Sequence, residues 1–512
     1  MFFWYRHRFL HTILSKPHLI VRLHANHRYT SHQLTFVLSD TVSGTIVSPA
    51  ANDSLTPLAL VISHSTTGRM SMKKMIFAGA MVACAMLLAP LSLTAGVAED
   101  CISCHKENNP GLHNQWHYSK HGVNDIGCID CHEADKADKD AFDHHGASIA
   151  TLVTPKDCGK CHEAQAEQTT NSYHAHAGEI LESNDAYLAH VAGGHPIVIT
   201  GCESCHGGKV LIDESQPNKL SPLSWPNSGI GRLNPDGSKG SCNACHSRHS
   251  FSAEQARQPE NCGKCHLGPD HPQKEIFEES KHGIAYYSNK DKMNLDKEEW
   301  IVGKDYYEAP TCSTCHMSAT STQQITHDVG DRISWTLRPP VSKFKDNWQA
   351  KRGNMKEVCL NCHQKPFVDG HYYQYDALVH LYNDKFAKPA GKIIGMLKEK
   401  KVFKNTAAFS NEVEWLYWEL WHHEGRRARM GTAMMGPDYA WWHGIYDVAH
   451  NFYFKFIPEA RHYNDPEVNA YIDNLLKTDP MHTWLNADTA SLKKKINSGE
   501  FQKIYSDLFN RQ

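Results

Sequence analysis

The stretch Cys101-Ile-Ser-Cys-His105 places two cysteines around two other residues and follows the second cysteine with a histidine. This C-x-x-C-H string occurs eight times in the chain. A random chain with 17 Cys and 36 His among 512 residues would hold roughly 0.04 such strings, so the repetition is not accidental. Each string offers two thiols that can bond the vinyl groups of a haem and an adjacent imidazole that can ligate its iron. The pattern therefore predicts eight covalently attached c-type haems.

Sixteen of the seventeen cysteines belong to these strings, and Cys84 is the remaining one. The cysteines predicted to bind haem are Cys101, Cys104, Cys128, Cys131, Cys158, Cys161, Cys202, Cys205, Cys242, Cys245, Cys262, Cys265, Cys312, Cys315, Cys359 and Cys362. The predicted proximal iron ligands are His105, His132, His162, His206, His246, His266, His316 and His363. Zinc sites or a disulfide framework would account for paired cysteines, but neither explains the histidine that follows every pair.

The overall composition excludes several classes of protein. The 53 Lys+Arg residues nearly balance the 56 Asp+Glu residues, which leaves no electrostatic basis for binding nucleic acid. With 40% hydrophobic and 21% charged residues, the composition is typical of a folded globular protein. A disordered chain or a multi-span membrane protein would differ clearly from it.

Residues 70–98 have the features of a secretion signal. Two lysines are followed by an apolar run and then by the small residues 96–98, after which a signal peptidase could cleave. Because such a signal should be N-terminal, we interpret residues 1–69 as a start-site overcall. An uncleaved membrane anchor and a lipoprotein attached at Cys84 are the alternatives. Covalent haem attachment fits an exported chain, so we expect a periplasmic protein.

Removal of residues 1–98 would leave roughly 50 residues for each of eight haems, too few to give each haem its own domain. We therefore expect a mainly α fold. Residues 99–365 should form short helices and loops around closely packed haems, and residues 366–512, which contain no cysteine, should form a C-terminal helical domain. Asn411 and Asp465 are expected to begin helices in that domain.

Histidines outside the strings are candidates for the second axial ligand of each iron. An iron with two histidine ligands transfers electrons, whereas an iron with an open position can also bind a substrate. Local sequence singles out four candidates: His121 and His282 in Ser-Lys-His-Gly, His249 in Ser-Arg-His-Ser, and His327 in Thr-His-Asp. An ordinary core or surface histidine is the alternative for each.

Three stretches carry a resemblance to a known family: Cys242-Asn-Ala-Cys-His246-Ser-Arg-His249-Ser-Phe, Cys262-Gly-Lys-Cys-His266-Leu-Gly-Pro-Asp270-His271 running on to Glu279-Ser-Lys-His282-Gly, and Thr326-His327-Asp328 through Trp335. With the order of the strings, they resemble the octahaem hydroxylamine oxidoreductase family. The resemblance covers residues 101–363 well and the helical region more loosely.

This resemblance implies that the fourth string, with Cys202, Cys205 and His206, holds the catalytic haem. It also implies that Asp270 and His271 reach over the open face of that haem, that the other seven haems are bis-histidine relays, and that the chain forms a homotrimer. The residue types suit the task, because hydroxylamine oxidation removes electrons and protons together. A capped turn after a Gly-Pro dipeptide is the alternative role for the Asp-His pair.

Oxidising members of that family carry a tyrosine from a neighbouring subunit that is joined covalently to the catalytic porphyrin and biases the iron toward oxidation. The nearest equivalent here is Gly436-Pro-Asp-Tyr439-Ala-Trp-Trp442, which makes Tyr439 the candidate. Alternatives are Asp438 at the family position if the alignment rests on Trp442, Tyr446, Tyr453 or Tyr463 as the tyrosine, and a packing role for Tyr439.

Together these inferences predict an enzyme that oxidises hydroxylamine to nitric oxide or nitrite at one open haem. The substrate class is a small nitrogen compound (hydroxylamine, hydrazine or nitrite), and the redox partner is a cytochrome or a quinone-linked protein. A relative without the tyrosine cross-link would run in the opposite direction, from nitrite or hydroxylamine to ammonia. A non-catalytic conduit in which every iron has two histidine ligands is the third possibility.

Overall fold

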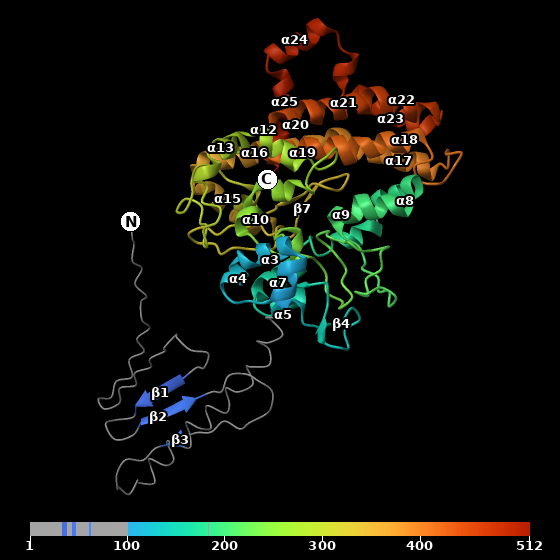
Figure 1. The fold of residues 1–512 in the computed structure, drawn as a ribbon. Coiled ribbons are helices and arrows are strands. Elements are labelled where there is room, and N and C mark those ends of the chain that lie inside the picture. Colours follow the sequence, from blue (N-terminus) through green and yellow to red (C-terminus); the bar gives the residue numbers. More distant parts are fainter. Residues whose placement is uncertain (1–32, 38–42, 48–60, 63–100, 183, 512) are drawn as a thin grey trace. The chain divides into compact units, whose positions relative to one another are not determined.

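The structure is a computed structural model that describes residues 33–37, 43–47, 61–62, 101–182 and 184–511 (Figure 1). The chain divides into two compact units, Met1–Leu93 and Thr94–Gln512. In the first unit, β1 (Gln33–Val37), β2 (Ser43–Val47) and β3 (Val61–Ile62) form an antiparallel sheet in that order. The expected signal peptide at 70–98 lies outside the described residues, so it and the interpretation of residues 1–69 remain predictions.

The second unit is mainly α, which confirms the predicted fold class. Its first part consists of short helices: α3 (Pro110–His117), α4 (Lys120–Val123), α5 (Cys128–His132), α6 (Pro155–Gly159), α7 (Glu163–Asn171), α8 (Asn184–Ile197), α9 (Glu203–His206), α10 (Ala253–Arg257), α11 (Pro259–Gly263), α12 (Gln273–Glu279), α13 (Lys281–Ser288) and α14 (Cys312–His316). The helices α5, α9 and α14 each end at the histidine of a C-x-x-C-H string. In the described part of this unit the strands form two small hairpins, β4 (Phe142–His144) with β5 (Ala147–Ile149) and β6 (Trp335–Thr336) with β7 (Lys343–Phe344).

Helices also make up the rest of the chain, and the longest of them lie here. The first, α15 (Trp348–Leu360), contains the first cysteine of the last string. It is followed by α16 (Lys365–Tyr382), α17 (Lys388–Glu399), α18 (Glu412–Trp418), α19 (Gly425–Ala433), α20 (Pro437–Ala440), α21 (Asp447–Asn451), α22 (Ile457–His462), α23 (Pro466–Thr478), α24 (Thr489–Asn497) and α25 (Glu500–Ser506). Several are joined end to end by π-helical segments: η6 (Asn383–Ala387), η7 (Glu419–Glu424), η8 (Trp441–Tyr446) and η9 (Phe452–Phe456). None of the helices in the described residues is long and apolar enough to cross a membrane.

The two helix starts that the sequence predicted lie where expected. Asn411 immediately precedes α18, and its side chain donates to Glu414 Oε2 at 3.0 Å. The Asp465 carboxylate accepts hydrogen bonds from the backbone of Glu467 and Val468 at the start of α23, where proline occupies the first turn.

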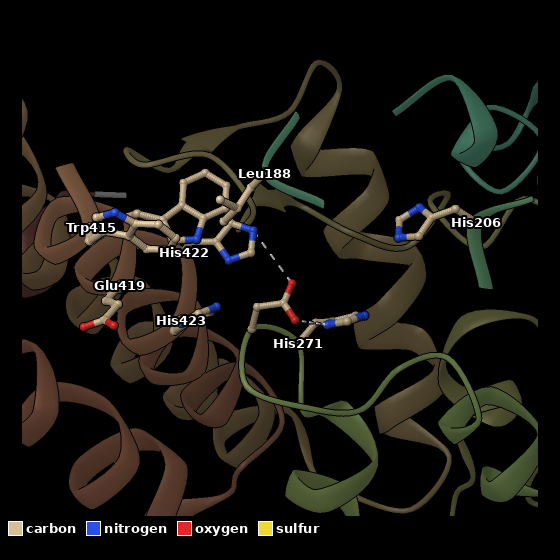
Figure 2. A pocket seen from close by; sticks show the side chains of 9 residues that line it. Leu188, His206, His271, Trp415, Glu419, His422 and His423 are labelled. Carbon is tan, nitrogen blue, oxygen red and sulfur yellow. Dashed lines mark hydrogen bonds and ion pairs between the residues drawn. The ribbon is translucent and has the colours of Figure 1, made fainter. Parts of the chain in front are cut away.

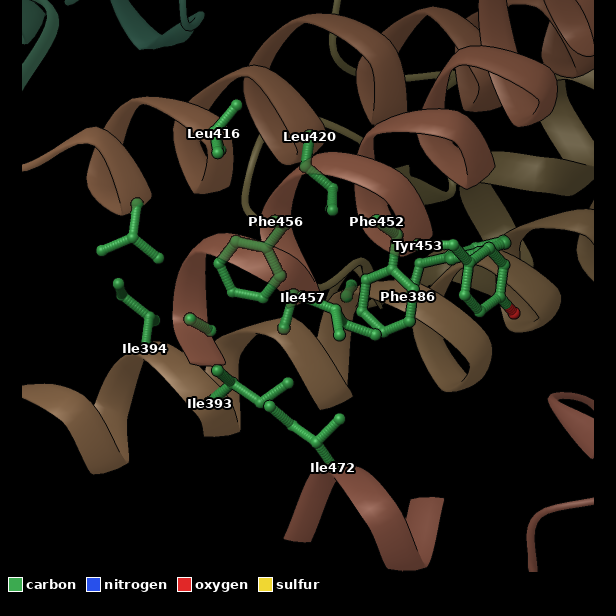
Figure 3. Packing of buried hydrophobic residues seen from close by; sticks show 14 of the residues in the cluster. Phe386, Ile393, Ile394, Leu416, Leu420, Phe452, Tyr453, Phe456, Ile457 and Ile472 are labelled. Atoms are coloured by element: carbon green, nitrogen blue, oxygen red, sulfur yellow. The ribbon is translucent and has the colours of Figure 1, made fainter. Parts of the chain in front are cut away.

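The largest apolar core lies among these longer helices (Figure 3). Phe386, Ile393, Leu420, Phe452 and Ile472 are all fully buried there and come from five different elements. Burial of each such side chain contributes roughly 1.5–3 kcal/mol, so this layer has a conventional hydrophobic interior. The layer forms part of the same compact unit as the string-bearing region, and the boundary predicted at residues 365/366 remains a prediction.

A carboxylic acid is buried inside this helical layer. Both oxygens of Glu424, the last residue of η7, accept hydrogen bonds from Asn451 Nδ2, at 3.1 and 3.2 Å. Burial raises the pKa of Glu424 to about 8, and the hydrogen bond from Asn451 offsets this only in part.

The pH dependence of stability should report this carboxyl. Because its folded-state pKa lies above the ordinary value of 4.5, protonated Glu424 stabilises the fold at low pH, and that contribution is lost as the pH rises toward about 8. We expect Glu424→Gln to flatten the dependence of the unfolding midpoint on pH over that window, as measured by circular dichroism. The exposed Glu298, replaced by Gln, is the matched control. An unchanged slope in Glu424→Gln would contradict the assignment.

Candidate functional site

Five string histidines each face a second histidine at nearly the same distance. The ring centroids are 6.2 Å apart for His105 and His144, 6.2 Å for His162 and His121, 6.3 Å for His132 and His249, 6.1 Å for His266 and His174, and 6.0 Å for His363 and His282. Two imidazoles that ligate one metal from opposite sides, each at about 2 Å, have ring centroids about 6 Å apart. The donor pairs therefore fit bis-histidine haem irons.

Three of the four predicted distal ligands, His121, His249 and His282, belong to these pairs. The fourth, His327, lies near the fifth string: burial, followed by the charges of His246 and His162, lowers its pKa to about 4. Sequence reasoning missed His144, which lies on β4, and His174, which follows α7, because neither stands in a distinctive local motif.

The two Ser-Lys-His-Gly tetrapeptides adopt the same local structure. Ser119 and Ser280 precede α4 and α13, and each hydroxyl accepts a hydrogen bond at 3.1 Å from the backbone of the glycine three residues on, Gly122 or Gly283. A Cβ atom on Gly283 would lie 1.9 Å from the Phe277 carbonyl oxygen, so glycine is required there. The capped first turn explains why this short motif presents its histidine in the same way twice.

Thiols from different strings come together in space. Three pairs lie close enough for one cysteine to raise the pKa of the other: Cys242 acts on Cys158, Cys312 on Cys262, and Cys205 on Cys265. These contacts join the third string to the fifth, the sixth to the seventh, and the fourth to the sixth. Haems attached at these points would therefore be close neighbours, as electron transfer through the protein requires.

The fourth string is held by backbone contacts on both sides. His206 Nδ1 donates to the Ala177 carbonyl oxygen at 3.3 Å, the kind of hydrogen bond that orients a metal-ligating histidine. The backbone N–H groups of Ile230 and Gly231 donate to the carbonyl oxygens of Cys205 and His206, at 2.9 and 3.0 Å. A distant loop thus fixes the end of α9 and the direction of its histidine.

A cavity of about 350 Å³ opens beside this histidine. Its lining residues are Leu188, His206, Asp270, His271, Trp415, Trp418, Glu419, His422 and His423. Figure 2 shows His206 on one side of the cavity, the wall formed by Trp415 and His422 on the other, and His271 between them. The predicted catalytic pair and the fourth-string histidine therefore share one cavity.

Asp270 and His271 form a tightly coupled pair at the floor of this cavity. His271 Nδ1 lies 2.5 Å from Asp270 Oδ1, and Arg426 Nη1 donates to Asp270 Oδ2 at 3.0 Å. Burial alone would raise the pKa of Asp270, but the hydrogen bond to His271 and the charges of His271 and Arg426 outweigh it and hold the pKa well below its usual range. Asp270 is therefore a carboxylate, and His271 directs its Nδ1–H toward it.

Comparison with known proteins agrees with this geometry. The family model described as "Seven times multi-haem cytochrome CxxCH" matches residues 233–403. A probable nitrite reductase-hydroxylamine oxidoreductase fusion protein of Kuenenia stuttgartiensis is 26% identical over 324 residues, which are 53% of this chain and 34% of that protein. The chain thus spans about a third of the length of that relative.

Solved structures complete the comparison. A hypothetical multihaem protein has a TM-score of 0.62 at 25% identity and covers 73% of this chain and 96% of its own. The reducing hydroxylamine oxidoreductase-like complex of Kuenenia stuttgartiensis has the same fold, with a TM-score of 0.54 at 20% identity, covering 75% of this chain and 88% of its own. Residues 233–403 thus match a multihaem cytochrome family, and the chain is similar to hydroxylamine oxidoreductase-like multihaem proteins. These similarities support an electron-transfer oxidoreductase with covalently bound c-type haems.

In this multihaem cytochrome, Tyr439 lies apart from the cavity of its own chain. It belongs to α20 and is not among the described residues that line the cavity. Its ring centroid lies 5.4 Å from that of His443, and burial, followed by the charges of Glu275 and Glu279, raises its pKa. A role in a neighbouring subunit, as predicted, remains a prediction.

The opposite wall of the cavity was not anticipated from the sequence of this multihaem cytochrome. His422 is buried and stacks on Trp418, with ring centroids 4.0 Å apart. Burial lowers the pKa of His423 to about 4. These residues lie in α18 and η7, more than a hundred residues from the Asp-His pair. A pair of adjacent histidines beside two tryptophans was the one available signal.

Proposed function

We propose that this cytochrome is a periplasmic octahaem enzyme that oxidises hydroxylamine to nitric oxide or nitrite at the haem of the fourth string. The observation that carries the proposal is the single cavity shared by His206 and the Asp270–His271 pair. The features of residues 70–98 support the periplasmic location. The eight strings support the count of eight haems, seven of which would relay electrons.

The chain's own residues supply what such a reaction needs. The haem would be tethered through Cys202 and Cys205, with His206 as its proximal ligand, and when bound it supplies an iron that holds nitrogen and accepts electrons. His271, oriented by Asp270, takes the protons that leave the substrate. The apolar side chains of Leu188 and Trp418 line the cavity, and its volume of about 350 Å³ suits a small substrate.

A homotrimer is part of the proposal. The side chains of Trp441, Trp442 and Tyr446 are half exposed on η8, immediately after Tyr439. Exposed aromatic side chains in such a group are typical of subunit interfaces. Tyr439 would then lie at the boundary between two subunits, as the predicted cross-link requires. The external electron partner would be a small cytochrome or a quinone-linked protein.

Reduction of nitrite or hydroxylamine to ammonia is the second candidate. Two relatives favour it by name, one as a nitrite reductase fusion and the other as a reducing complex. Mapping of peptides that retain a porphyrin-linked tyrosine separates the two directions. A cross-linked Tyr439 would support oxidation, and its absence would support reduction.

The decisive experiment uses the purified holoprotein. We expect one high-spin haem in the electron paramagnetic resonance spectrum, a spectral change on adding hydroxylamine or nitrite, and turnover of one of them. Intact-mass measurement should give eight attached haems. A spectrum from low-spin haems alone, with no response to either compound, would instead establish a non-catalytic conduit.

A further inference from the structure

Arg426 contacts the Asp270 oxygen that His271 does not contact, and it makes several other contacts. It belongs to the first turn of α19, directly after η7. Its Nη1 donates to Asp270 Oδ2 and to His422 Nε2, both at 3.0 Å. Its Nε donates to the Arg338 carbonyl oxygen at 2.9 Å, and its guanidinium carbon lies 5.2 Å from the centre of the Trp421 ring. The side chain is therefore fixed at several points.

These contacts determine how the neighbouring groups are protonated. A guanidinium can only donate hydrogen bonds, so His422 Nε2 is the acceptor in its contact with Arg426. The same argument assigns Oδ2 of Asp270 to Arg426 and leaves Oδ1 for His271 Nδ1. His422 Nε2 and Asp270 Oδ2 lie 3.9 Å apart, and the arginine lies between these two acceptors.

We infer that Arg426 is a positioning residue that orients the Asp270–His271 pair for proton transfer. It fixes the Asp270 carboxylate in the rotamer in which Oδ1 holds His271 Nδ1, and the His271 ring then extends toward the side of the cavity where His206 lies (Figure 2). The inference rests on the proposed function, because it names a residue that acts through the proposed proton acceptor. Arg426 itself does not line the cavity among the described residues.

The contacts predict how Arg426 variants behave. Arg426→Gln removes the charge and the shared donor, so the carboxylate can rotate and His271 loses its orientation. Arg426→Lys keeps the positive charge but lacks the planar guanidinium group with its several N–H donors, so it should retain only part of the wild-type function. Replacing a group that orients an active residue through a hydrogen bond typically lowers activity about 10–100-fold. We expect a kcat loss of that size in Arg426→Gln, with KM little changed and an intermediate kcat in Arg426→Lys.

A binding measurement tests the inference without turnover. Cyanide binds an open haem iron after its acid loses a proton, so an oriented base should favour it. We would titrate the oxidised holoprotein with cyanide, follow the Soret band, and compare Arg426→Gln, Asp270→Asn and the double variant. Both single variants should bind cyanide about tenfold more weakly. The double variant should bind no more weakly than the weaker-binding single variant, because the two residues act as one unit.

Controls separate the possible failures. Arg461 makes a comparable contact at the protein surface, 2.6 Å to Asp473, and Arg461→Gln should bind cyanide like the wild type. Haem content and thermal unfolding show whether a variant has folded, and the lysine variant serves if the glutamine variant has not. A wild type that binds no cyanide would overturn the proposed function and the inference with it. A wild type that binds, with an unchanged affinity in Arg426→Gln and Arg426→Lys, would overturn the role of Arg426 alone.

Discussion

Asp270→Asn should lower kcat for the proposed substrate by roughly 10²–10⁴-fold, the range expected when an acid–base pair is disabled. The amide has the shape of the carboxylate but no charge, and its nitrogen can donate toward His271 Nδ1. His271 would then carry its proton on the nitrogen that faces the cavity and could no longer accept one from the substrate. KM should change little, because neither group anchors the substrate.

Steady-state kinetics of the holoprotein with hydroxylamine and with nitrite would measure this effect. Haem content and the optical spectrum should match the wild type, since Asp270 attaches no haem. Asp473→Asn is the matched control, because that carboxylate also binds an arginine but lies at the surface. A kcat equal to that of the wild type would remove Asp270 from the proposed mechanism.

His174→Ala should convert one low-spin haem into a high-spin haem. The rings of His174 and His266 have the spacing of two ligands on one iron, and removal of one ligand leaves that iron with an open position. Electron paramagnetic resonance should then show one more high-spin signal than the wild type. The exposed His176, which pairs with Glu179 at 2.8 Å, provides the control variant His176→Ala.

The same variant resolves a choice that the geometry raises. The His271 ring centroid also lies 6.0 Å from that of His266, so two histidines are within range of one proximal ligand. His271 is held by Asp270 and lines the cavity with His206, which favours His174 as the ligand. If His174→Ala left the spectrum unchanged and His271→Ala produced the new signal, the catalytic role of His271 would have to be abandoned.

How much the sequence could predict depended on how local each feature is. The strings are self-contained, because one helical turn brings two thiols and an imidazole to a single haem, so the haem attachment residues followed from spacing alone. His121 and His282 could also be predicted from the sequence, because a serine cap and a glycine define the helical turn in which each lies. His144 and His174 are not preceded by a comparable local motif, so the sequence did not indicate them.

The cavity wall illustrates the limit of this reasoning. Arg426 and His422 approach Asp270 only because α18, η7 and α19 join end to end and bring this helix against the string-bearing region. The adjacent histidines beside tryptophans were a signal for His422, but nothing in the local sequence distinguishes Arg426 from the residues of an ordinary amphipathic helix. The resemblance to a family was enough to predict Asp270 and His271. Arg426, which holds the pair, could be identified only from the packing of the helices.

The thiol contacts give the relay a branched layout. The third string meets the fifth through Cys158 and Cys242 and bypasses the fourth, which meets the sixth through Cys205 and Cys265. In the proposed reaction, electrons from the cavity would thus enter near the middle of the array and could spread along two arms. Two routes away from the cavity would let successive electrons leave without waiting for a single exit haem.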